Sequence, residues 1–176
     1  MKKFELTGEF VINIFGKKLF RIRALVAFGN VEAGELGGYV EKEENLSDAG
    51  DAWVSGNARV SGDAWVSGDA QVFGDAWVSG DARVSGDAQV FGDARVSGDA
   101  DILQITGLGT VHRTTTVFRT PNGIRISCGC FYGDLDAFRE HVKKTREGKV
   151  QREYLKFADL VEIYFGEDKE DECECS

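Results

Sequence analysis

Residues suited to binding an anion gather between positions 112 and 125. Arg113, Arg119 and Arg125 carry guanidinium groups, and His112 precedes the first of them. Arginine recognises phosphate through paired, charge-assisted hydrogen bonds, so two or three such side chains suffice for one small phosphate-bearing ligand. Because Arg119 and Arg125 flank a Pro-Asn-Gly turn, we expect paired strands to bring them together. The alternative is that these are ordinary solvated charges on a surface hairpin.

Four cysteines offer a second kind of chemistry. Cys128 and Cys130 are separated by one glycine on an expected strand, which would point both thiols to one side, and Cys173 and Cys175 repeat the spacing. Four thiols can form a zinc site, but this CxC spacing is tighter than the usual CxxC, and acids around the second pair disfavour the thiolate. We therefore predict no metal site and no cofactor, and whether the two CxC pairs bind metal stays open.

A small ββαα module, residues 106–165, is expected to position these side chains. The segments "TTTVFRT" and "IRISCGC" flank the Pro-Asn-Gly turn, which is a strong hairpin signal. Asp134 can cap a helix that places Leu135, Phe138 and Val142 on one side. A second helix, from about Gln151 to Phe165, would align the apolar side chains of Tyr154, Phe157, Ala158, Val161 and Phe165. The acidic segment 166–176 is expected to be disordered.

A six-residue repeat fills the middle of the chain. From Asp51 onward, nine hexapeptides of the form Asp-Ala-X-Val-Ser/Phe-Gly follow one another without a slip. A helix is excluded because Gly recurs at every sixth position and Ala, Val and Gly do not share one helical face. Strand alternation points Ala and Val to one side and X to the other, while Gly-Asp supplies a corner. Each hexapeptide is therefore one short strand and one turn.

The repeat resembles the hexapeptide-repeat superfamily. A longer period of 18 residues appears when Gly68–Ser85 is set against Gly86–Leu103, as expected if three hexapeptides close one triangular coil. The resemblance implies a left-handed parallel β-helix, an exception to the right-handed crossover rule. We expect a mainly β fold: an N-terminal β-hairpin cap and lead-in coil (1–46), a β-helix of about three to four coils (47–105), and then the ββαα module.

The 18-residue period assigns each outward side chain to a face. One face carries two outward phenylalanines, one coil apart. An aromatic ladder of this kind is expected to be covered, either by another subunit or by the terminal segments of the chain itself. We predict that this face forms a homo-oligomer interface, and the resemblance favours a trimer. The interface would contain Trp53, Gln71, Phe73, Gln89 and Phe91.

Charge separates the regions of this chain, whose net charge is −9. Residues 48–101 hold ten acids against three arginines, whereas residues 102–165 hold ten bases against seven acids. The acidic rod works against stable binding of duplex nucleic acid, which needs many phosphate contacts. Columns of corner aspartates permit a surface that mimics DNA, although the turn itself also favours Asp after Gly.

The order of segments resembles a group of phage and prophage hexapeptide-repeat proteins that are usually labelled as transferases. The resemblance runs from "LFRIRALVAFGNVEAGELGGYVEKEENLS" through the Gly-Asp-Ala hexapeptides to "FRTPNGIRISCGCFYGDLDAF". It implies a viral origin and the cytoplasm of an infected bacterium, which agrees with the lack of a membrane-span or secretion pattern. Short phage proteins of this kind often act against host defences. We expect a non-catalytic protein that sequesters a small, nucleotide-like anion; direct inhibition of a host defence protein is the alternative.

Acyl transfer is the enzymatic alternative that the superfamily suggests. Its acyltransferases place a histidine base near the groove between subunits and usually carry a loop thrown out of the coils. The repeat here contains neither, so His112, after the coils, is the candidate base, while His141 is expected on the surface of a helix. A three-histidine metal site of the carbonic anhydrase type is disfavoured because the chain has two histidines. We therefore favour a binding protein over an enzyme.

Overall fold

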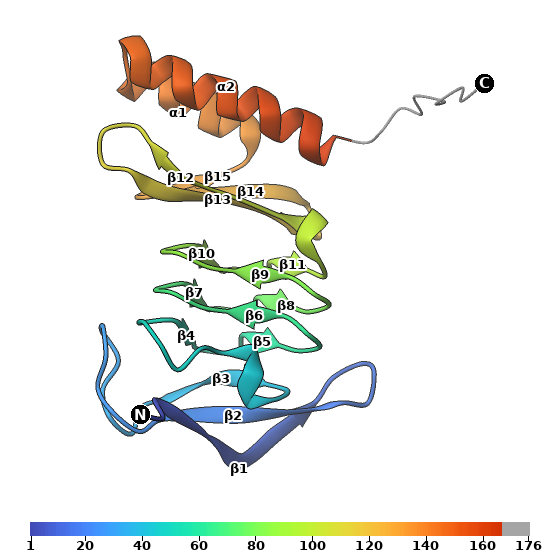
Figure 1. The fold of residues 1–176 in the computed structure, drawn as a ribbon. Helices are drawn as coiled ribbons and strands as arrows, with labels where there is room; N and C mark the ends of the chain where they lie inside the picture. Colours follow the sequence, from blue (N-terminus) through green and yellow to red (C-terminus); the bar gives the residue numbers. More distant parts are fainter. Residues whose placement is uncertain (167–176) are drawn as a thin grey trace, which may run out of the picture.

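The hexapeptides stack into a short rod that is closed at both ends. The computed structural model describes residues 1–166, and the expected disordered tail, apart from Gly166, lies outside these residues. A strand-built cap lies at one end of the rod, and a sheet covered by two helices lies at the other (Figure 1). The prediction of a mainly β protein built on a short parallel β-helix is confirmed.

The rod consists of eight two-residue strands. Parallel pairing places each Val directly over the Val 18 residues later, as in Val54↔Val72, so three strands make one coil. The sides of the rod are the sheets β4–β7–β10, β5–β8–β11 and β6–β9. Every repeat Ala and Val from Ala52 to Val96 is at most 1% exposed, so these residues form the core. The strands are β4 (Trp53–Val54), β5 (Arg59–Val60), β6 (Trp65–Val66), β7 (Gln71–Val72), β8 (Trp77–Val78), β9 (Arg83–Val84), β10 (Gln89–Val90) and β11 (Arg95–Val96).

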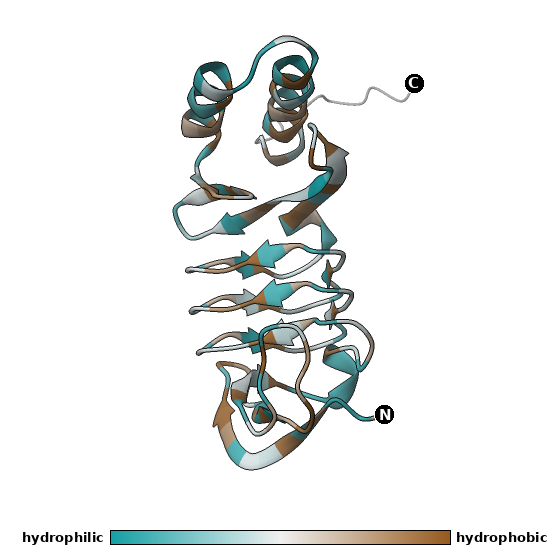
Figure 2. Cartoon of the chain, turned by 90° about the vertical axis from the view of Figure 1, so that its left-hand side faces the viewer, coloured by the Kyte–Doolittle hydropathy of each residue, from teal (hydrophilic) through white to brown (hydrophobic). Residues whose placement is uncertain are grey.

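Glycine is required at the corners because successive coils approach there closely. Gly80 has a φ of +63°, and a Cβ at this position would lie 1.9 Å from the carbonyl oxygen of Ser97 in the next coil. The aspartate that follows each glycine also contributes, as where Asp69 Oδ1 accepts a hydrogen bond of 3.0 Å from the amide of Asp51. Hydrophilic and hydrophobic residues alternate around each coil in Figure 2, as this arrangement demands.

The N-terminal cap confirms the predicted hairpin. Strands β1 (Phe4–Ile12) and β2 (Lys18–Ala24) pair antiparallel around Gly16, and β2 pairs with β3 (Leu36–Val40). Strand β3 then runs parallel to β5, with Val40 opposite Val60, which makes β3 part of an earlier, imperfect coil. The short 3-10 turn η1 (Glu43–Asn45) completes that coil. Phe4 and Ile22 bring the cap into the core of the rod.

The C-terminal module has four strands where two were predicted. The antiparallel sheet has the order β12–β13–β14–β15 and is followed by two helices. The ninth hexapeptide does not complete a coil: η2 (Asp99–Asp101) turns the chain and Ile102 starts the first strand of the new sheet. The elements are β12 (Ile102–Leu108), β13 (Arg113–Thr120), β14 (Gly123–Cys128), β15 (Phe131–Gly133), α1 (Leu135–Thr145) and α2 (Gly148–Phe165).

Both predicted helices are confirmed. The Asp134 side chain caps α1 by accepting a 2.8 Å hydrogen bond from the amide of Ala137, and α2 starts three residues before the predicted position. The predicted apolar residues of α2 are all buried against the sheet: Tyr154, Phe157, Ala158, Val161 and Phe165. No helix within residues 1–166 is long and apolar enough to span a membrane.

The module's sheet separates two cores. Phe118 of β13 points to the rod and joins its core, whereas the neighbouring Val117 joins the core beneath the helices. The sheet therefore closes the last coil with one face and carries α1 and α2 on the other, which places the helices at the far end of the molecule from the cap (Figures 1 and 2).

Candidate functional site

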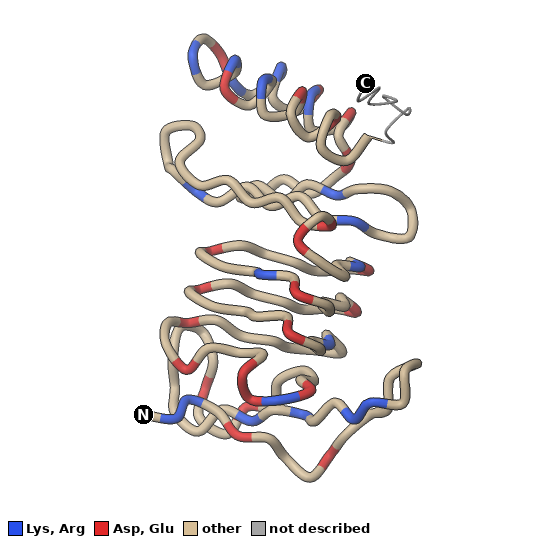
Figure 3. The backbone as a smooth tube through the Cα atoms, turned by 45° about the vertical axis from the view of Figure 1, so that its right-hand side comes forward, with Lys and Arg blue, Asp and Glu red and all other residues tan. Residues whose placement is uncertain are grey.

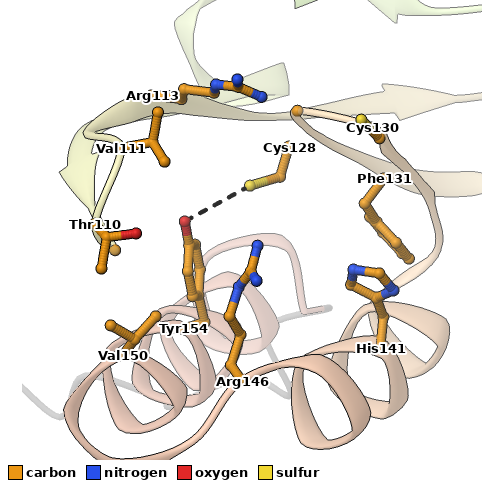
Figure 4. A pocket seen from close by; sticks show the side chains of 12 residues that line it. Thr110, Val111, Arg113, Cys128, Cys130, Phe131, His141, Arg146, Val150 and Tyr154 are labelled. Atoms are coloured by element: carbon orange, nitrogen blue, oxygen red, sulfur yellow. Dashed lines mark hydrogen bonds between the residues drawn. The ribbon is translucent and has the colours of Figure 1, made fainter.

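A hollow of about 180 Å³ opens between the helices and the sheet of the module. The turn between β12 and β13, the turn between β14 and β15, and facing residues of α1 and α2 surround it (Figure 4). The lining side chains with polar or reactive groups are Thr110, Arg113, Cys128, Cys130, His141, Arg146 and Tyr154.

Cationic groups dominate the electrostatics of this hollow. Arg113 enters from the strand side and Arg146 from the helix side, and His141 lies at the rim (Figure 4). The lining contains no aspartate or glutamate. Within residues 1–166, neither Arg113 nor Arg146 has a carboxylate within 4.0 Å. Two guanidinium groups without carboxylate partners favour an anion in the space between them.

A chain of hydrogen bonds lies in the wall of the hollow. The Thr115 hydroxyl donates to the Cys128 sulfur over 3.2 Å, and the Cys128 thiol lies 3.9 Å from the Tyr154 hydroxyl. The Tyr154 hydroxyl in turn donates to the carbonyl oxygen of Leu108 over 3.4 Å. Burial and the neighbouring Cys128 raise the pKa of Tyr154 to about 12. Tyr154 is therefore a neutral hydrogen-bond donor at physiological pH.

The remaining wall is apolar and partly aromatic. Phe131 lies beside His141, with ring centroids 5.0 Å apart and planes tilted by 38°. A smaller adjoining hollow of about 30 Å³ adds Phe138 and Val142. Cationic groups at one side and rings at the other suit a ligand that combines an anionic group with a planar or apolar part.

Three stretches of the rod match one family model, at residues 52–68, 70–86 and 88–101. That model describes the YdcK beta solenoid repeat. The chain is a repeat β-helix protein. No curated protein matches the chain. Because the YdcK-type repeat ends at residue 101, the match accounts for the rod, whereas the chemistry of the hollow rests on residues of the module.

The structure divides the four residues that were predicted as one ligand site. Arg113 lines the hollow, but His112 lies exposed in the β12–β13 turn, where its φ is +53° and its Nδ1 is 3.1 Å from the carbonyl oxygen of Gly107. Arg119 and Arg125 lie instead at the opposite end of the β13–β14 hairpin, beside Asn122.

Arg119 and Arg125 do not form the pair that their positions around the turn suggested. The strand register pairs Arg125 with Phe118, so Arg119 and Arg125 start from opposite faces of the sheet. Arg119 is already bound, with its Nε 3.0 Å from Asp101 Oδ1 and its guanidinium over the Phe165 ring. The shallow surface that both line also contains acids, which reduces its attraction for anions: Asp134, Asp136 and Glu162.

The cysteine pair is also arranged differently from the prediction. Strand β14 ends at Cys128, which pairs with Phe131, and Gly129 with a φ of +60° places Cys130 in the turn. The two thiols therefore do not share one side of a strand: Cys128 points into the wall and Cys130 is exposed. Among residues 1–166 no cluster of three metal-ligating side chains occurs. Cys173 and Cys175 lie outside the described residues.

The aromatic face of the rod is partly covered by the chain itself. Trp53 is 2% exposed beneath Phe28, with ring centroids 5.4 Å apart, so this residue is not available to a partner as predicted. Phe73 and Phe91 stack with centroids 4.8 Å apart, and Tyr132 of the module covers the end of this stack at 4.4 Å from Phe91. Gln71 and Phe73 are half-buried and Gln89 is exposed. Their role in an oligomer stays a prediction.

Sequence reasoning missed Arg146 and Tyr154 as site residues. Tyr154 was assigned only to the buried stripe of α2, although its hydroxyl requires a polar partner when buried. Arg146 follows the last residue of α1, and its direction depends on how the chain turns into α2. A polar tip on an apolar stripe and a base at a helix end were the available signals.

Proposed function

We propose that this protein is a non-catalytic binding protein that holds a small phosphate-bearing molecule in the hollow between Arg113 and Arg146. The observation that carries the proposal is the convergence of two guanidinium groups on a space whose lining contains no carboxylate. A phosphate between them would accept charge-assisted hydrogen bonds from both sides. His141 and the hydroxyl of Tyr154 add further donors or charge at the same site.

The neighbouring groups favour holding a ligand over transforming it. The hydroxyl of Tyr154 keeps its proton because its pKa is about 12, and it is tied to Leu108 and Cys128. The Cys128 sulfur is held between two hydroxyl groups, those of Thr115 and Tyr154. These groups act as fixed donors, which is what a sequestering site needs.

The biological setting of this proposal comes from the resemblance to phage hexapeptide-repeat proteins. We propose that the protein counteracts host defence in the bacterial cytoplasm by removing a small signal nucleotide. The rings of Phe131 and His141 beside the two arginines support a nucleotide-like ligand, because a base can stack while its phosphate is bound. In this view the rod provides a rigid body and a lateral interface for a homo-oligomer, with a trimer as the preferred number.

The direct experiment compares native mass spectra of protein purified from cells with an active nucleotide-signalling defence, before and after denaturation. A released small molecule identifies the ligand; a ligand-free protein directs the search to a titration with nucleotides and inorganic phosphate. Arg146→Gln and Arg113→Gln should each weaken binding roughly tenfold or more. Arg152→Gln, an exposed change outside the lining on α2, is the matched control and should leave affinity unchanged. Equal affinity in all four proteins would refute the site.

The corner aspartates support a second candidate, direct inhibition of a host protein. Aspartates of successive coils lie above one another, as Asp51 and Asp69 do, and most are exposed. Such columns present repeated negative charge to a nucleic-acid-binding surface. A stable complex with a host protein that forms equally well with Arg146→Gln would favour this candidate over ligand sequestration.

A further inference from the structure

The two ends of the molecule carry complementary surfaces. The tip of the β1–β2 hairpin, here called the hairpin tip, exposes Ile12 (61%), Ile14 (79%) and Phe15 (75%). These apolar side chains lie beside Lys17 and Lys18. An ordered, protruding cluster of large apolar side chains marks an interaction surface.

The hairpin tip is held in one conformation. The Asn13 side chain accepts hydrogen bonds from the amides of Phe15 (3.0 Å) and Lys17 (2.9 Å), and Gly16 completes the turn with a φ of +78°. The exposed apolar residues are thus presented by a built turn, which reduces the entropy lost on binding.

The cap is basic although the protein as a whole is acidic. Residues 1–24 contain six lysines and arginines and two glutamates, in a chain of net charge −9. At the tip itself Lys17 is bridged to Glu41 at 2.8 Å, whereas Lys18 lies over the Phe10 ring at 4.5 Å and has no carboxylate within 4.0 Å among residues 1–166. The hairpin tip therefore fits a partner surface that is apolar and acidic.

The C-terminal end of α2 has this composition. Leu160 and Ile163 are 47% and 77% exposed, and Tyr164 is 42% exposed beside them. Arg139 neutralises Asp159 and Glu162 on the helix, but the chain continues into residues 167–176, which contain six acids and one lysine. This surface, here called the acidic end, lies at the opposite end of the rod from the hairpin tip (Figures 1 and 3).

We propose that the hairpin tip of one molecule binds the acidic end of a second copy, so that rods associate head to tail. The opposite locations of the two surfaces in Figure 1 prevent the tip from meeting the acidic end of its own chain. In this contact Ile14 and Phe15 pack on Ile163, and the lysines of the tip meet the acids of residues 167–176. A heterologous contact of this kind does not close on itself and produces a growing chain of molecules. It differs from the lateral face of Phe73 and Phe91, which would give an oligomer of fixed number.

Sedimentation velocity over a range of protein concentration and salt tests the proposal. The wild-type mass should increase steadily with concentration and decrease between about 0.05 M and 0.5 M salt, because the charged pairs are screened. The tip variant, Ile14→Ser with Phe15→Ser, and the end variant, Ile163→Ser with Glu172→Lys and Glu174→Lys, should each weaken growth roughly tenfold or more. Leu36→Ser, a 48% exposed change at the other end of the β2–β3 pairing, is the matched control and should grow like wild type. Thermal unfolding checks that all variants fold.

Mixing the two variants distinguishes head-to-tail contact from other assemblies. The tip variant keeps its acidic end and the end variant keeps its tip, so the mixture should form one-to-one pairs that do not grow further. A wild-type mass that does not change with concentration overturns the proposal, as does a mixture that forms no pairs. Flotation of the wild type, but not the tip variant, with phosphatidylserine vesicles would assign the hairpin tip to an anionic lipid surface instead. None of these readouts depends on the ligand of the hollow.

Discussion

The hydroxyl of Tyr154 lies 3.9 Å from the thiol of Cys128 and 3.4 Å from the carbonyl oxygen of Leu108. This contact joins α2 to strands β12 and β14 at the wall of the candidate ligand site. It connects the stability of the module to the protonation of one phenol, because burial favours the neutral hydroxyl.

The stability of the module should decrease at alkaline pH. Tyr154 has an ordinary pKa near 10 and a folded-state pKa of about 12, so the folded protein binds this proton more tightly. The stabilisation is present below pH 10 and is lost as the pH rises towards 12. In Tyr154→Phe this part of the pH dependence should disappear, as measured by urea unfolding at about pH 9 and about pH 11. Tyr164→Phe, at a 42% exposed tyrosine, is the control, and an identical decrease in all three proteins would contradict the assignment.

Gly80→Ala should destabilise the rod more than Gly16→Ala does. Both glycines have positive φ, +63° and +78°, so both substitutions carry the left-handed backbone penalty of about 1–2 kcal/mol. A Cβ at Gly80 would also lie 1.9 Å from the Ser97 carbonyl oxygen, whereas nothing lies within 4 Å of one at Gly16. The free energy of unfolding should therefore fall further in Gly80→Ala by at least about 1 kcal/mol. Equal losses would mean that the coils separate without cost.

Asn45→Ala should loosen the first coil. The buried Asn45 amide donates to the carbonyl oxygens of Gly62 (3.0 Å) and Ala64 (2.8 Å). Its removal leaves buried carbonyl groups unpaired, so we expect a loss of about 2 kcal/mol or more in the free energy of unfolding. The exposed Asn57 bonds only to the Asp75 side chain, and Asn57→Ala should cost about 0.5 kcal/mol or less. Urea denaturation of both variants provides the comparison, and equal costs would count against the role of Asn45.

Phe73→Glu should reduce the mass of a lateral oligomer. Phe73 stacks on Phe91 and remains half-buried on the aromatic face, where a carboxylate would be desolvated by a partner. Phe91→Glu is the less specific change because Phe91 also contacts Tyr132 and Phe118 of its own chain. Multi-angle light scattering at high salt, where end-to-end contacts are screened, measures the effect. An unchanged mass would show that this face is not the interface.

The rod and its faces could be predicted from the sequence because the repeat contains its own contacts. Each Val packs on the Val 18 residues away, and each Gly meets a Gly of the next coil, so local pattern and tertiary partner are the same information. The capped helix at Asp134 and the buried stripe of α2 were predictable for a similar reason, since both depend on residues within a few positions. The predicted pairing of Arg119 with Arg125 failed because strand register, which decides the face of each side chain, cannot be read from the turn alone.

What the sequence determined by itself is therefore the six-residue strand-and-corner unit, the 18-residue coil and the two helices. Only the tertiary structure decided that Ile102 leaves the rod for a new sheet, and that Arg113, Cys128, Arg146 and Tyr154 line one hollow. These residues are separated by as many as 41 positions and come from a turn, a strand end and two helix segments. Their meeting depends on how the sheet closes the last coil and how the helices pack on it, which is set by long-range burial of Phe118 and Val117 on opposite faces.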